Sequence, residues 1–179
     1  MRTILQSLRI YLVLTLLTGV LYPLAMTGIA QLFFPNQANG SRILERDKLI
    51  GSSLIAQKFE NPKYFWPRPS SGDYATVPSG ASNKGPTAAD LKKSIEERRE
   101  KFGANAPVDL LTASGSGLDP HISPEAARLQ IPRVAGTRKI AAEKLATLVD
   151  QLIEHPQLGF LGEPRVNVLQ LNLAVDQLQ

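Results

Sequence analysis

No charged side chain occurs between Arg9 and Arg42, and residues 10–34 are apolar almost throughout. A helix of these residues would be about 37 Å long at about 1.5 Å per residue. The hydrocarbon core of a bilayer is about 30 Å thick. We therefore predict a transmembrane helix over residues 10–34, preceded by a short terminus of residues 1–9. Residues 35–179 have the length of one domain with a modest core.

A cleaved signal peptide is the alternative for this apolar segment. Arg2 and Arg9 supply the basic start of such a peptide, and Gly28 and Ala30 give the small-x-small pattern of a cleavage site. However, the apolar run is longer than the usual core of a signal peptide, and it continues past that pattern to Phe34. We therefore favour a retained transmembrane helix.

The positive charge of the chain is spread out. The formal net charge is +4, but two of the twenty Lys and Arg residues precede the apolar segment and all sixteen acids follow it, which leaves about +2 for the rest. No concentrated basic face results, so we expect no nucleic-acid partner. Charge also leaves the membrane orientation open. Basic residues flank both sides of the segment, with Arg2 and Arg9 before it and Arg42, Arg46 and Lys48 after it.

Small or groove-forming residues recur every four positions in the apolar segment, at Thr15, Gly19, Pro23 and Thr27. Membrane helices pair where small residues let two backbones approach closely, because apolar surface gains little from meeting other apolar surface in lipid. The alternative is that Gly, Pro and Thr are simply common in membrane helices. We favour a ridge that packs against a partner helix.

After the membrane segment, the pattern predicts an α+β domain with few strands. We expect helices over residues 87–102, capped by Thr87 and ended by Gly103, over 123–130 after a Ser-Pro cap, and along an apolar stripe over 145–153. We expect Pro132 to break or restart the second helix. Strands are predicted over 108–113 and 165–169, whereas 49–59 and 169–178 fit either a strand or a helix. Residues 61–86 read as a long ordered loop that carries aromatic rings.

No catalytic motif is complete. Gly80 and Gly85 have P-loop spacing, but Pro86 and Thr87 follow where phosphate binding needs Lys and Ser or Thr. Ser114 or Ser116 with Asp119 and His121 suggests a triad, but these residues lie within a few positions of one another and do not match G-x-S-x-G. Cysteine is absent, and two histidines are too few to suggest a metal site. We therefore expect an accessory or binding subunit with no active site, cofactor or metal of its own.

Several strings then point to a known family: FFPNQANGS, GSSLIAQKF, FWPRPS, SGASNKGPT, LLTASGSGLDPHISPEAARLQIPRVA and PRVNVLQLNLAVD. In this order they resemble the C subunit of the Kdp-type potassium-transporting ATPase over essentially the whole chain. The resemblance implies a subunit of a high-affinity potassium-uptake complex, which supports the assembly and stability of the other subunits. It implies partners similar to the channel-like KdpA, the P-type ATPase KdpB and the small KdpF, with potassium and ATP bound at the level of the complex.

The resemblance also implies a topology. The chain is expected to cross the bacterial plasma (inner) membrane once, with a cytoplasmic N-terminus and an external domain. A second role proposed for the family is a catalytic chaperone that raises the ATP affinity of the ATPase subunit, and Gln130 is then the place to test for a nucleotide contact. We expect partner contacts in two loops, with internal packing as the alternative. Their candidate residues are Trp66, Arg68, Tyr74, Ser82, Asn83, Ser114, Ser116, Asp119 and His121.

Overall fold

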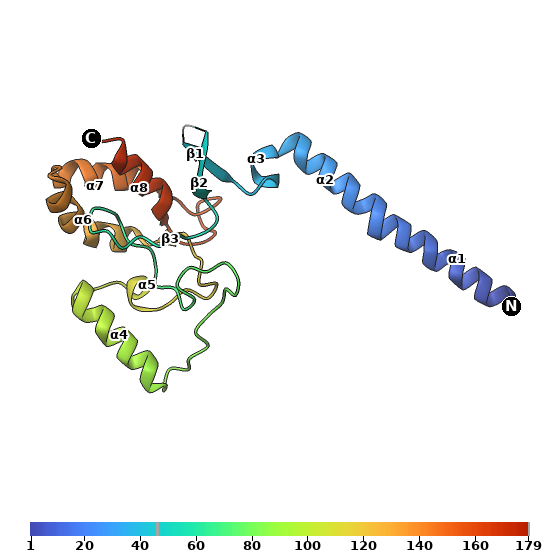
Figure 1. Cartoon of the computed structure of the whole chain (residues 1–179), viewed down its shortest axis with the longest axis horizontal. Coiled ribbons are helices and arrows are strands. Elements are labelled where there is room, and N and C mark those ends of the chain that lie inside the picture. Colours follow the sequence, from blue (N-terminus) through green and yellow to red (C-terminus); the bar gives the residue numbers. More distant parts are fainter. Residues whose placement is uncertain (46, 179) are drawn as a thin grey trace. The chain divides into compact units, whose positions relative to one another are not determined.

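The computed structural model of the chain describes residues 1–45 and 47–178 (Figure 1). Arg46, which was counted among the charges that flank the apolar segment, lies outside the described residues. The chain divides into two compact units, Met1–Ser52 and Ser53–Gln179. The first unit therefore includes a short hairpin as well as the N-terminal helix.

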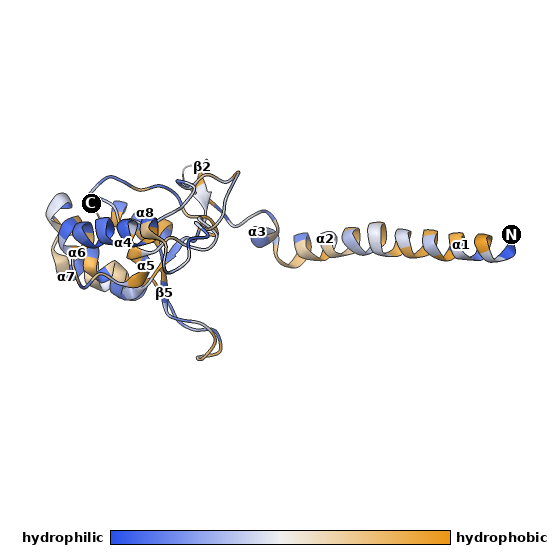
Figure 2. Ribbon diagram, turned by 90° about the horizontal axis from the view of Figure 1, so that it is seen from below, coloured by the Kyte–Doolittle hydropathy of each residue, from blue (hydrophilic) through white to orange (hydrophobic). Residues whose placement is uncertain are grey.

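The first unit is dominated by one apolar helix, Arg2–Phe33 (Figure 2). It consists of α1 (Arg2–Leu16), a π-helical turn η1 (Leu17–Leu21) and α2 (Tyr22–Phe33). Its 32 residues are long and apolar enough to cross a bilayer, and none of its side chains is buried within the chain. The helix includes most of the predicted short terminus. The unit ends with α3 (Pro35–Ala38) and an antiparallel hairpin of β1 (Arg42–Glu45) and β2 (Lys48–Ser52).

The π-helical turn lies just before Pro23, which has no N–H to donate to the preceding turn. Residues four apart on an α-helix advance about 40° round the axis at each step. A π-helical turn uses i→i+5 hydrogen bonds and so takes more residues per turn. It therefore reduces this drift and keeps Thr15, Gly19 and Pro23 closer to one line. Thr27 does not present a free hydroxyl, because its Oγ1 donates to the Pro23 carbonyl at 2.8 Å.

The second unit is an α+β domain. A three-stranded antiparallel sheet runs in the order β3 (His121–Ile122), β5 (Arg165–Asn167) and β4 (Ile153–Glu154). The helices are α4 (Ala89–Phe102), α5 (Val108–Leu111), α6 (Pro124–Arg138), α7 (Ala142–Gln151) and α8 (Val168–Asp176). Helix α7 packs against both α6 and α8, and α4 packs on α5 (Figure 1). The core gathers buried side chains from β3, β5, α5, α6, α7 and α8 and from the loop before α4, including Phe65, Leu110, Ile122, Leu145, Val166 and Leu171.

Several predicted elements are confirmed, with local reasons for their ends. Ser123 caps α6, since its hydroxyl accepts from the Ala126 N–H at 3.1 Å. The predicted strand at 165–169 ends at Asn167, because the Asn167 side chain accepts from the Gln170 N–H at 3.2 Å and starts α8 directly. Residues 169–178, which fit either a strand or a helix in sequence, therefore continue as helix α8 as far as Asp176.

Other predictions were wrong. Residues 108–113 are not a strand, because Val108–Leu111 form one helical turn that buries Leu110 and Leu111. Helix α6 does not stop near Gln130 but continues through Pro132 to Arg138. Buried residues on both sides of Pro132 hold the helix, and the bond that proline cannot make would involve the carbonyl of Arg128, an exposed residue that water can reach. Thr87 is not a cap, because α4 begins at Ala89 with no side-chain cap.

Candidate functional site

The two loops expected to contact partners meet in the structure. Arg68 Nη1 lies 2.8 Å from Asp119 Oδ2, and both side chains are only about 30% exposed, at 27% and 29%. The Ser114 N–H donates to the Pro69 carbonyl at 3.0 Å. The sequence presents these loops as separate candidates, whereas the folded chain makes them one surface. We call residues 61–83 and 114–121 the joined loops.

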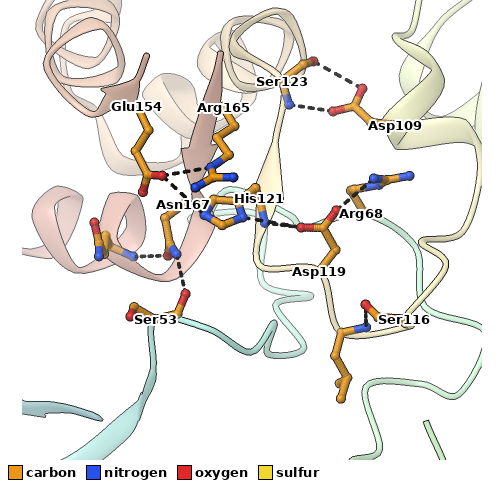
Figure 3. A network of polar contacts seen from close by, with 12 residues as sticks. Ser53, Arg68, Asp109, Ser116, Asp119, His121, Ser123, Glu154, Arg165 and Asn167 are labelled. Carbon is orange, nitrogen blue, oxygen red and sulfur yellow. Dashed lines mark hydrogen bonds and ion pairs between the residues drawn. The ribbon is translucent and has the colours of Figure 1, made fainter. Parts of the chain in front are cut away.

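A chain of polar contacts connects the joined loops to the sheet (Figure 3). His121 lies between two carboxylates, with Nδ1 3.5 Å from Asp119 and Nε2 3.7 Å from Glu154. Glu154 also accepts from Arg165 Nε at 2.9 Å. Strands β3 and β4 both pair with β5, which brings these residues together although they are far apart in sequence. The network therefore joins the second loop to both edge strands.

This network lines a shallow pocket of about 420 Å³. On its other side, Asp109 accepts from the Ser123 N–H at 2.7 Å and lies 3.2 Å from the Ser123 hydroxyl. The pocket therefore mixes acidic and basic groups, and two of them, Arg68 and Asp119, already pair with each other. Its lining includes Arg68, Asp109, Asp119, His121, Ser123 and Arg165.

The carboxyl of Asp119 is held in its charged form. Burial by itself would raise its pKa, but hydrogen bonds from the His121 side chain and backbone and the charge of Arg68 outweigh burial. The pKa of Asp119 consequently lies below its ordinary value. Asp119 therefore stays a carboxylate near neutral pH. This indicates that it serves as the partner of a structural ion pair and not as a group that exchanges protons.

Trp66 lies in a stack of cations and rings. Arg133 lies 3.6 Å and Lys101 Nζ 3.9 Å from the centre of its ring, and Phe102 meets it edge-on. Burial lowers the pKa of Arg133 to about 10. Arg133 is also tied to the chain, since it donates to the Tyr64 carbonyl at 2.9 Å. The indole therefore packs within the domain, as the alternative interpretation allowed.

Gln130, the residue considered for a nucleotide contact, is 2% exposed. Its Oε1 accepts from the Trp66 N–H at 2.8 Å and from Arg133 at 2.7 Å. Its Nε2 donates to the carbonyls of Trp66 and Ala126 at 3.1 and 3.2 Å. All the hydrogen-bonding capacity of this amide is used inside the domain. A nucleotide would have to break these bonds to reach it.

The backbone of Phe65, the residue before Trp66, is held by a buried amide in the same way. Asn172 on α8 accepts from the Phe65 N–H at 2.8 Å and donates to the Phe65 carbonyl at 3.0 Å. Two buried amides, one from α6 and one from α8, thus satisfy both backbone groups of two consecutive loop residues. This pairing keeps the first of the joined loops ordered without a strand.

The remaining candidates differ in accessibility. Tyr74 donates its hydroxyl to the Arg68 carbonyl at 2.8 Å, and burial, with the charge of Asp73, raises its pKa to about 12. Ser82 and Asn83 are exposed and line an open hollow of about 660 Å³ beside α4. Of the candidates on the first loop, these two are the ones most available to a partner.

The serine residues are not placed for catalysis. Ser114 is buried at 3% exposure, and the exposed Ser116 uses its hydroxyl to accept from the Leu118 N–H at 3.1 Å (Figure 3). The ring nitrogens of His121 face carboxylates on both sides, so neither is directed at a serine. In the part of the chain that the structure describes, no three acidic or histidine side chains are grouped to hold a metal.

Sequence reasoning missed Asp109, Arg133, Glu154, Arg165 and Asn172, each of which holds part of this region. No local motif marks them, because their partners lie in distant segments. The pairing of Asn172 with Phe65, for example, spans 107 positions.

Comparison with known proteins gives a consistent result over the length of the chain. Residues 4–177 match the family model described as KdpC: K+-transporting ATPase, c chain. A potassium-transporting ATPase KdpC subunit of Polaromonas naphthalenivorans is 52% identical, over 100% of this chain and 97% of the relative. The proteins of the same name from Leptospira interrogans and Geotalea uraniireducens are 50% and 48% identical, over 95% and 99% of this chain and 91% and 99% of theirs.

Proposed function

The chain belongs to the KdpC family of K+-transporting ATPase c chains, and we propose that it is the non-catalytic accessory subunit of a high-affinity, ATP-driven potassium-uptake complex. In this role it supports the assembly and stability of the subunits that conduct potassium and hydrolyse ATP. Potassium and ATP are bound by the complex through those other subunits. The joined loops, whose polar groups are mostly paired with each other, support a structural role for this chain.

One observation carries the proposal: the apolar helix Arg2–Phe33 has no side chain buried within the chain. So large an exposed apolar surface needs a nonpolar environment, and its length suits a bilayer. The helix and the family membership together indicate a membrane-bound subunit. We propose that the ridge of Thr15, Gly19, Pro23 and Thr27 packs on a membrane helix of a partner subunit.

We propose partners similar to the channel-like KdpA, the P-type ATPase KdpB and the small KdpF. We further propose that the chain lies in the bacterial plasma (inner) membrane, with its N-terminus in the cytoplasm and the second unit outside. One feature supports this orientation: the chain has no cysteine, which suits an oxidising compartment. Charge does not contribute, because basic residues flank both sides of the apolar segment.

The test is co-purification from membranes. The tagged full chain is expected to bring down a P-type ATPase subunit, and Gly19→Leu combined with Pro23→Leu should reduce that recovery at least fivefold by blocking close helix approach. A Cβ on Gly19 meets no heavy atom of the described residues within 4 Å, apart from the helix's own nearby backbone, so a side chain has room at this position. Ala25→Leu is the control, because Ala25 lies about 200° round the helix from Pro23.

Two outcomes would contradict the proposal. The first is failure of the wild-type chain to recover a P-type ATPase. The second concerns nucleotide: a photoreactive ATP analogue added to the intact complex is expected to label another subunit, and specific labelling of this chain would favour the catalytic-chaperone role. Equal recovery with the Gly19 and Pro23 variant and with the Ala25 variant would remove the ridge from the proposal.

A further inference from the structure

The connection between β4 and β5 exposes three large apolar side chains within four positions. Leu158, Phe160 and Leu161 are 83%, 74% and 50% exposed. Figure 2 shows this connection projecting from the second unit beside β5, with an apolar tip. We call residues 156–162 the apolar finger. Exposed apolar residues scattered singly are ordinary on protein surfaces, whereas a cluster of this kind marks an interaction site.

The finger has a defined backbone conformation. The Gln157 N–H donates to the Leu161 carbonyl at 3.0 Å, and the Leu161 N–H donates back at 2.9 Å. Leu158 has φ of 54°, a left-handed conformation that is costly for a leucine, and Gly159 follows with φ of 84°. Leu158 thus combines a strained backbone conformation with a side chain that is 83% exposed.

The base of the finger is firmly attached to the core. Ile153 and Glu154 pair with Val166 and Arg165, and Val166 is completely buried. Across the base, Arg165 Nε donates to Glu154 at 2.9 Å. A turn mounted on two strands of the central sheet loses little conformational freedom on binding, which favours its use as an anchor.

Charge decides which kind of surface the finger suits. Between Glu154 and Arg165 the only formally charged side chain is Glu163, and there is no Lys or Arg. Protein segments that enter anionic membranes combine apolar residues with basic ones, because the lipid headgroups attract positive charge. The finger has the apolar half of that pattern and is followed directly by one acid, Glu163, so a nonpolar hollow on a protein suits it better than a bilayer surface.

We propose that the apolar finger docks into a nonpolar hollow on another subunit of the same potassium-transport complex, with Phe160 as the central anchor. Aromatic side chains that enter a pocket are typical centres of binding energy, and flanking apolar residues exclude water from them. This inference rests on the proposed function, because it takes the partner from the complex in which the chain is proposed to act.

The first experiment measures recovery of the partner subunits with the tagged full chain from detergent-solubilised membranes. Leu158→Asn combined with Phe160→Ser should lower recovery at least tenfold; asparagine tolerates the left-handed conformation at position 158. Val108→Ser is the matched control, since Val108 on α5 is an isolated apolar side chain with 71% exposure. It should change recovery less than twofold. Normal recovery with the finger variant would overturn the inference.

The second experiment keeps an aromatic group at the tip. Photoreactive benzoylphenylalanine in place of Phe160 is expected to cross-link the full chain to another subunit of the complex in native membranes. Adducts with lipid, adducts with a second copy of this chain, or no adduct would each overturn the inference. The two proposals fail differently. If the Gly19 and Pro23 variant loses assembly, whereas the Leu158 and Phe160 variant assembles normally and position 160 gives no cross-link, the accessory role is retained and the docking of the finger is rejected.

Discussion

Arg68 Nη1 lies 2.8 Å from Asp119 Oδ2, and this ion pair ties together two loops that are 51 positions apart in the chain. Both side chains are more than two-thirds buried, so the pair is screened less than a surface salt bridge. Asp119 also contacts His121, and His121 contacts Glu154 on β4, so the pair connects the loops to the sheet.

We expect Arg68→Gln and Asp119→Asn each to lower the free energy of unfolding by about 1–2 kcal/mol, because each leaves a largely buried charge without its partner. The double variant should lose less than the sum of the two, with a coupling of about 1 kcal/mol. The measurement is urea unfolding of the full chain in detergent, followed by the fluorescence of Trp66, the single tryptophan. Strict additivity would contradict the coupling.

The depressed pKa of Asp119 predicts a pH dependence. Its folded-state pKa lies below the ordinary value of 3.8, so the unfolded chain binds a proton first as the pH falls. The stability that Asp119 contributes is therefore fully present above the ordinary pKa and is lost as the pH falls through the folded-state pKa. The difference in unfolding free energy between wild type and Asp119→Asn should be largest near neutral pH and should shrink below about pH 4. A difference that stays constant across this range would contradict the assignment.

Gly117 is a position that only glycine fits. Its φ is +71°, and a Cβ there would lie 2.9 Å from the carbonyl oxygen of Gly80 in the other loop. We expect Gly117→Ala to destabilise the domain by about 1–3 kcal/mol. Gly115→Ala is the control, because a Cβ on Gly115 would meet no heavy atom within 4 Å among the residues described. Thermal unfolding of the two variants compares them directly, and equal stability would show that the loops do not pack closely at Gly117.

Gln130 is expected to act through structure. Gln130→Met keeps the length of the side chain but leaves both backbone groups of Trp66 without their buried partners. The free energy of unfolding should fall by about 1–3 kcal/mol. Gln151→Met, on the exposed end of α7, should change it by less than about 0.5 kcal/mol. Unchanged stability of the Gln130 variant in urea unfolding would reopen a ligand-binding role for this side chain.

Local signals in the sequence were sufficient for several parts of the chain. The absence of charge over residues 10–34 predicts the long apolar helix, the stripe at Leu145 and Val149 predicts α7, and Ser123 with Pro124 predicts the start of α6. Each of these signals lies within one or two helical turns. Such elements form wherever the rest of the chain allows them, because capping and periodicity act between near neighbours.

The tertiary structure decided what those signals could not. Helix α6 passes through Pro132 because its two neighbouring turns are buried, and residues 108–111 form a helix because Leu110 enters the core. The joined loops depend on pairs such as Arg68 with Asp119 and Phe65 with Asn172. These contacts arise between residues 51 and 107 positions apart. No local pattern encodes them, because they exist only after the core has brought distant segments together.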